Sequence, residues 1–167
     1  MIGQLLGVVL AFLGGAVLSG IRGAQDSRLR LSRRYGLALA LEALLLLAAM
    51  QAFKQQQLLG ALFAATACGL QNAMTTTYSG AVVRTTHLTC MFTDLGICLG
   101  QALHGLPLPR RRIRLSLLII GGFLLGGLLG AWAYRRVGFD ALLAPALLTG
   151  LVGTCYALQA HYRRRTR

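Results

Sequence analysis

The sequence predicts an all-α fold, a polytopic bundle of transmembrane helices, and three observations support this. Of the 167 residues, 56% are hydrophobic and only 13% are charged, whereas soluble domains carry about 25% charged residues. Long apolar stretches occupy most of the chain, and the basic residues gather in the short connections between them. A soluble globular fold is therefore excluded, and so is a disordered chain, which needs low hydrophobicity. We expect residues 1–167 to form a single integral membrane domain.

Each long apolar stretch corresponds to one expected helical segment. In chain order the stretches are Ile2–Ile21, Gly36–Phe53, Leu58–Met74, Leu88–Leu103, Leu115–Tyr134 and Ala141–Ala160. A bilayer core of about 30 Å needs roughly 20 helical residues. The first, fifth and sixth stretches reach this length, the second is slightly short, and the third and fourth are shorter still. We therefore expect about five to six hydrophobic segments, of which not all are complete spans.

The distribution of Lys and Arg among the connections indicates which segments cross the membrane. If all six stretches crossed fully, eight basic residues would lie on one side and nine on the other. If the region Leu58–Leu103 crosses only once, the sides hold thirteen and three, and Arg84 stays within the membrane region. The positive-inside rule favours the second arrangement. It predicts one broken or re-entrant helix around residues 75–86 and a cytoplasmic C-terminus.

The segment Gln71–Thr89 is polar, rich in threonine and interrupted by Gly80. Free backbone groups in hydrocarbon cost several kcal/mol each, so a broken helix at this depth must pack within protein or line a wet cavity. The polar side chains that we expect at such a site from this segment are Asn72, Arg84, Thr86 and His87. Asp94 follows at a spacing that places it on the same helix face as His87.

Glu42 is the only acid in the second apolar stretch. It comes eight residues after Arg34, which is about 12 Å along a helix. An ionisable residue at membrane depth costs about 2.5–3.5 kcal/mol on insertion scales and is a functional-site hypothesis. The alternative is structural, because Arg84 could neutralise Asp94 or Glu42 in a buried pair that specifies the fold. His87 likewise could be a hydrogen-bonded structural residue.

Glycines recur every four residues in two of the apolar stretches. Gly96 and Gly100 form one such pair, and Gly122, Gly126 and Gly130 form a longer series. Small residues at this spacing allow two transmembrane helices to approach closely. We expect the longer series to form a packing face within the chain or between copies, as in a homo-oligomer.

The sequence contains no Walker, GxSxG or HExxH motif and no pair of catalytic carboxylates. Its cysteines, Cys68, Cys90, Cys98 and Cys155, have no metal-type spacing. We therefore expect no enzymatic activity, no metal and no cofactor. The basic residues have no separate folded surface on which to bind nucleic acid, so we expect the lipid bilayer as their partner.

Several of these motifs together resemble those of a known family. They are Gln71-Asn72-Ala73, Gly80, Thr85-Thr86-His87-Leu88-Thr89, Thr93-Asp94-Leu95-Gly96 and Gly100. The chain resembles the YoaK-like uncharacterised proteins of the bacterial inner membrane over essentially its whole length. The resemblance implies this location but no established activity. Members usually begin with a further pair of hydrophobic segments, so we expect a member that is shortened at the N-terminus.

These observations favour a transporter or permease-like protein for a small solute or a proton. Arg84 would bind an anionic group, with His87 and Asp94 as proton or hydrogen-bond partners. The remaining expected site residues are Asn72, Thr86 and Glu42. One alternative is a non-transporting structural or partner-binding membrane protein, and another is a shortened family member without activity. A third is an intramembrane enzyme that uses His87 and Asp94.

Overall fold

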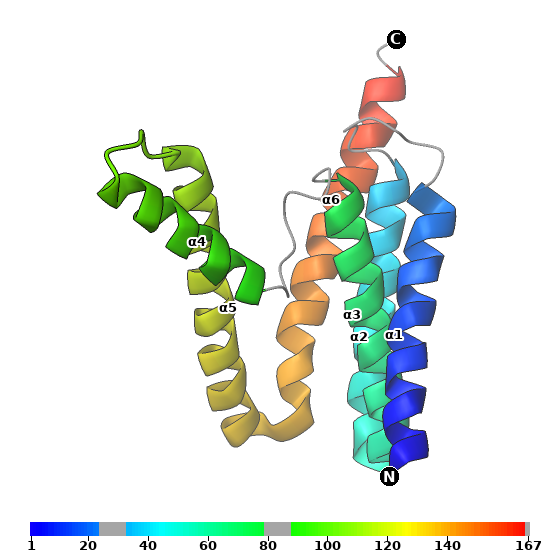
Figure 1. Ribbon diagram of the computed structural model, residues 1–167. Helices are drawn as coiled ribbons and strands as arrows, with labels where there is room; N and C mark the ends of the chain where they lie inside the picture. Colours follow the sequence, from blue (N-terminus) through cyan, green and yellow to red (C-terminus); the bar gives the residue numbers. More distant parts are fainter. Residues whose placement is uncertain (24–32, 79–87, 166–167) are drawn as a thin grey trace. The chain divides into compact units, whose positions relative to one another are not determined.

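The computed structural model describes residues 1–23, 33–78 and 88–165, and these residues form an all-helical fold. The helices are α1 (Ile2–Gly23), α2 (Arg33–Gln55), α3 (Gln57–Tyr78), α4 (Leu88–Leu103), α5 (Arg110–Val137) and α6 (Leu143–Arg165), with a short 3-10 helix, η1 (Gly138–Leu142), before α6 (Figure 1). Within the described ranges the structure contains no strand. The predicted all-α class is therefore confirmed.

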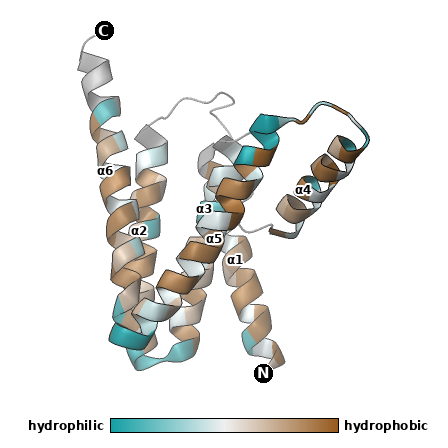
Figure 2. Ribbon diagram, turned by 90° about the vertical axis from the view of Figure 1, so that its left-hand side faces the viewer, coloured by the Kyte–Doolittle hydropathy of each residue, from teal (hydrophilic) through white to brown (hydrophobic). Residues whose placement is uncertain are grey.

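Most of these helices are long and apolar enough to cross a membrane. In the described part of the chain, four helical stretches meet this criterion, and the last of them, Arg110–Gln159, contains α5 and most of α6. Figure 2 shows apolar residues along the helices, with hydrophilic residues near many helix ends. Helix α4 has only 16 residues and is shorter than a complete span. The lengths of α3 and α4 thus agree with one full span between Leu58 and Leu103.

The predicted break in this region begins later than we expected. Helix α3 continues through Thr75, Thr76 and Thr77 and ends at Tyr78, so the break does not begin at residue 75. The Thr77 hydroxyl donates a hydrogen bond of 2.8 Å to the Ala73 carbonyl one turn earlier. A threonine whose hydroxyl bonds back to its own helix is tolerated inside that helix. The polarity of the segment did not indicate that the helix continues through its threonines. Residues 79–87 of the predicted break lie outside the described residues.

The chain divides into two compact units. The first comprises Met1–Val83 and Val137–Arg167, and the second comprises Arg84–Arg136. The first unit contains α1, α2, α3, η1 and α6, whereas the second contains α4 and nearly all of α5. The helices of the first unit touch at glycines, whereas those of the second unit are joined by polar side chains.

In the first unit, α1 and α3 run side by side in the same direction, and their backbones touch at glycines (Figure 1). A Cβ atom on Gly15 would collide with the carbonyl oxygen of Thr66 and would lie 2.9 Å from the Leu70 nitrogen. A Cβ atom on Gly69 would collide with the carbonyl oxygen of Phe12. Only glycine fits at these two positions, because the obstacle is backbone that cannot rotate away.

Helices α2 and α6 are antiparallel and make a second contact of the same kind. A Cβ atom on Gly36 would lie 2.7 Å from the Gly153 carbonyl oxygen, and one on Gly153 would lie 2.9 Å from the Leu39 Cβ. Near the start of α2, the rings of Tyr35 and Tyr156 meet edge to face at 5.2 Å. The two helices are therefore in close contact over the first turns of α2.

The far end of α2 is held by η1. The Phe53 ring stacks on the Phe139 ring with centroids 4.7 Å apart, and Lys54 forms an ion pair of 2.5 Å with Asp140. Helix α6 thus begins where α2 ends, and its C-terminal end returns to the start of α2. Consequently the basic residues that open α2 and those that close α6 lie at the same end of this unit.

We predict that Gly15→Ala destabilises the first unit, whereas Gly14→Ala does not. A methyl group on Gly15 meets the α3 backbone, and overpacking of this kind costs about 1–3 kcal/mol. Among the described residues nothing lies within 4 Å of a Cβ atom on the neighbouring Gly14. Thermal unfolding in detergent, followed by circular dichroism, measures the difference. Equal midpoints for the two variants would contradict the glycine contact.

Candidate functional site

Glu42 lies midway along α2 and is only 3% exposed. It stands one helical turn after Ala38 and one turn before Leu46. Each of these neighbours belongs to an apolar cluster that joins α2 to other helices. The clusters consist of Ala38, Leu39 and Met74, and of Leu46, Ala67 and Ala146. The carboxyl group of Glu42 is therefore flanked by apolar packing on both sides along its helix.

The carboxyl group of Glu42 is not fully satisfied by the chain. Its Oε2 atom is buried and has no hydrogen-bond partner among the described residues. The ion pairs among the described residues join Lys54 to Asp140 and Arg112 to Asp94, so neither of them engages Glu42. The Cys68 thiol on α3 lies within electrostatic range of the Glu42 carboxyl group. Within the described ranges, Glu42 is therefore a buried acid that no ion pair engages.

Asn72 lies on α3, the helix that packs against α2 in the first unit. Its side chain is half-buried and is already engaged by another group of the chain. Two of the expected site residues, Glu42 and Asn72, are thus on neighbouring helices of one compact unit.

Asp94 lies on α4 in the second unit, and its carboxylate is paired with Arg112. The Arg112 Nη2 donates to the Asp94 Oδ1 at 2.9 Å, with the Asp94 side chain 28% exposed. One turn away, the Ser116 hydroxyl donates to the Met91 sulfur at 3.9 Å, and both residues are buried. These contacts place α4 antiparallel against the first turns of α5. The cation that neutralises Asp94 in this unit is therefore Arg112.

The other expected site residues are Arg84, Thr86 and His87, and all three lie outside the described residues. Their grouping with Glu42, Asn72 and Asp94 therefore stays a prediction. The same holds for the alternative in which Arg84 pairs with one of the acids.

The pairing of Arg112 was not predicted, because Arg112 is one of several basic residues in the connection after the fourth apolar stretch. Arg112 and Asp94 are 18 residues apart, too far to be neighbours on one helix. They meet because the chain turns back after α4 at Gly105, whose φ of 78° suits glycine. The Gly-Leu-Pro segment that follows α4 was the signal for such a hairpin.

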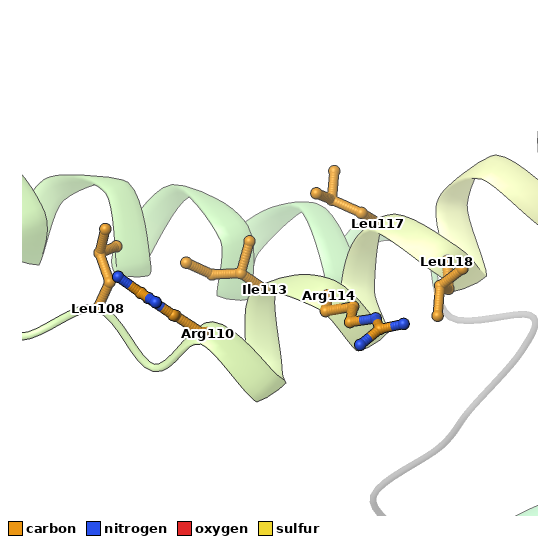
Figure 3. Close-up of a pocket in the computed structure, with 6 residues that line it drawn as sticks. All are labelled: Leu108, Arg110, Ile113, Arg114, Leu117 and Leu118. Atoms are coloured by element: carbon orange, nitrogen blue, oxygen red, sulfur yellow. The ribbon is translucent and has the colours of Figure 1, made fainter.

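A pocket of about 490 Å³ lies along the first turns of α5 (Figure 3). It is lined by Leu108, Arg110, Ile113, Arg114, Leu117 and Leu118. None of the expected site residues lines this pocket. Its lining combines aliphatic side chains with two guanidinium groups one turn apart.

The glycines of α4 and α5 have open space around them. No described atom lies within 4 Å of a Cβ atom built on Gly96, Gly100, Gly122, Gly126 or Gly130. The close contact expected at Gly96 and Gly100 is therefore not made within the described part of the chain. Among the same residues, no group of three or more His, Cys, Asp or Glu side chains gathers at one place to hold a metal ion.

The fold and these sites define an all-helical protein with helices of membrane-spanning length. The family model for proteins of unknown function named DUF1275 matches residues 1–155. The chain therefore belongs to the DUF1275 family. No curated protein and no solved structure matches the chain.

We predict that the Asp94–Arg112 pair contributes a coupling energy of up to about 1 kcal/mol, as exposed ion pairs do. Asp94→Asn and Arg112→Gln should each lower the stability of the second unit, and the double variant should lose less than the sum. Arg111→Gln, which removes a neighbouring charge, serves as the matched control. Thermal unfolding of the four variants in detergent measures the coupling, and strictly additive losses would refute the pair.

Proposed function

We propose that this DUF1275 protein is a transporter or permease-like membrane protein for a small solute. The site would lie at the break between α3 and α4. In this proposal Arg84 binds an anionic group of the solute, and His87 and Asp94 act as proton or hydrogen-bond partners. Asn72, Thr86 and Glu42 would complete the polar lining.

The single observation that carries the proposal is the burial of Glu42 in a helix of membrane-spanning length. An acid that is 3% exposed, with one oxygen lacking a hydrogen-bond partner in the described residues, is costly to maintain. Ionisable residues at membrane depth commonly mark substrate or ion pathways. Broken helices at the midplane are also typical of transporter binding sites.

We further propose that the protein resides in the bacterial inner membrane as a YoaK-like member, with its C-terminus in the cytoplasm. The basic residues that open α2 and close α6 share one end of the first unit, which favours a cytoplasmic position for that end. The lipid bilayer would be the main partner. Arg110 and Arg114, beside the aliphatic pocket on α5, could each add about 1 kcal/mol of attraction to anionic lipid.

The proposal predicts saturable flux of an anionic solute into liposomes that contain the purified protein. Arg84→Ala should abolish this flux because the anionic group loses its partner, while circular dichroism and gel filtration stay unchanged. Arg111→Ala removes a charge from the first turn of α5 and should keep the flux. Unchanged transport by a folded Arg84→Ala protein would remove Arg84 from the mechanism.

A second candidate is a structural or partner-binding membrane protein that uses the glycine face of α5. The observation that favours it is the contrast between glycines. Gly15, Gly36, Gly69 and Gly153 are in backbone contact with neighbouring helices, whereas Gly126 has no described atom within 4 Å of its Cβ position. A face of this kind suits close association with a second copy of the chain.

This candidate predicts that Gly126→Leu shifts the protein from an oligomer to a monomer in mild detergent, because the added side chain separates the helices. Ala131→Leu adds similar bulk outside the four-residue spacing and should leave the oligomer intact. Light scattering coupled to gel filtration measures both masses. An identical mass for the wild type and Gly126→Leu would exclude the face as an interface.

A further inference from the structure

Glu42 differs in burial and in pairing from the other acids that the structure describes. Asp94 and Asp140 are each paired with a basic side chain, at 2.9 Å and 2.5 Å, and neither is buried. Glu42 is buried at 3% exposure, and its Oε2 atom has no hydrogen-bond partner among the described residues. Within the described ranges, no basic side chain forms an ion pair with this acid.

The surroundings of Glu42 decide which cation fits. A metal ion requires several oxygen ligands, but the flanking clusters consist of aliphatic and methionine side chains. Leu70, on the packed helix α3, is fully buried. A proton needs no coordination sphere and no space beyond the carboxyl group itself. The proton is therefore the cation that this environment accommodates.

Among the described side chains, no ionisable group on the helices around α2 forms an ion pair with Glu42. Of these side chains, α3 offers the Cys68 thiol, and α6 offers Cys155 and the Tyr156 phenol, whose ring meets Tyr35. Asp140 of η1 is paired with Lys54 at the far end of α2. Among its described side chains, α1 carries no Asp, Glu, His, Lys or Arg.

The buried Glu42 has an exposed ionisable neighbour on α3. Cys68 is exposed, and its thiol interacts electrostatically with the Glu42 carboxyl group.

We propose that Glu42 is a proton-exchange site within the helix bundle and supplies the coupling ion of the proposed transport. A proton adds to a carboxylate oxygen and forms an O–H bond, and the same proton leaves when that bond breaks. No other bond changes. The proton exchange is a property of Glu42 itself. Only the coupling of this exchange to solute transport rests on the proposed function.

The test is labelling by dicyclohexylcarbodiimide, an apolar reagent that attacks protonated carboxyl groups and reaches them from the lipid phase. The wild-type protein in liposomes is treated over a range of pH, and the modified residue is mapped by mass spectrometry. The chain has only four acids, so the assignment is direct. We expect the label on Glu42, with a yield that falls as the pH rises, and loss of this label in Glu42→Gln.

Asp140→Asn is the matched control, because Asp140 is exposed and paired with Lys54, and it should label as the wild type does. Mapping the wild-type protein keeps the test decisive even where Glu42→Gln fails to fold. Any one of three outcomes would overturn the proposal. They are label on Asp94 or Asp140 instead of Glu42, no label on Glu42 at any pH, and a labelling yield on Glu42 that does not change with pH. Labelling without any solute flux would leave the proton site standing and reject the transporter, so the two failures are distinguishable.

Discussion

Close approach of helix backbones at glycine is the interaction on which the first unit depends. Between lipid-exposed helices there is little hydrophobic driving force, because the lipid is as apolar as leucine, so association relies on packing and hydrogen bonds. Gly15 and Gly69 bring α1 against α3, and Gly36 and Gly153 bring α6 against α2. Helix α2 also packs on α3. Its flanks are therefore covered by two helices, and this is why Glu42 is buried.

The burial of Glu42 separates it from the other described acids by environment rather than by residue type. Asp94 and Asp140 are partly exposed and each has a basic partner, so their charges cost little. Glu42 sits between two apolar clusters, where an ionised group without a partner is strongly disfavoured.

The second unit is held together differently from the first. An ion pair and a Ser116–Met91 contact join α4 to α5, while the glycines of both helices remain open in the described structure. The open glycines of α5 contrast with Gly15, Gly36, Gly69 and Gly153, which are in close contact with neighbouring helices.

The sequence by itself determined the all-α class, the helical segments and the bounds of α4, because hydropathy and length respond directly to the bilayer. It also singled out Glu42, since an acid in an apolar stretch is visible without a structure. It misplaced the start of the break, because Thr77 bonds back into α3. Which glycines touch backbone, and that Arg112 pairs with Asp94, were decided by tertiary structure alone. These contacts join residues on different helices, and no periodicity within one helix encodes them.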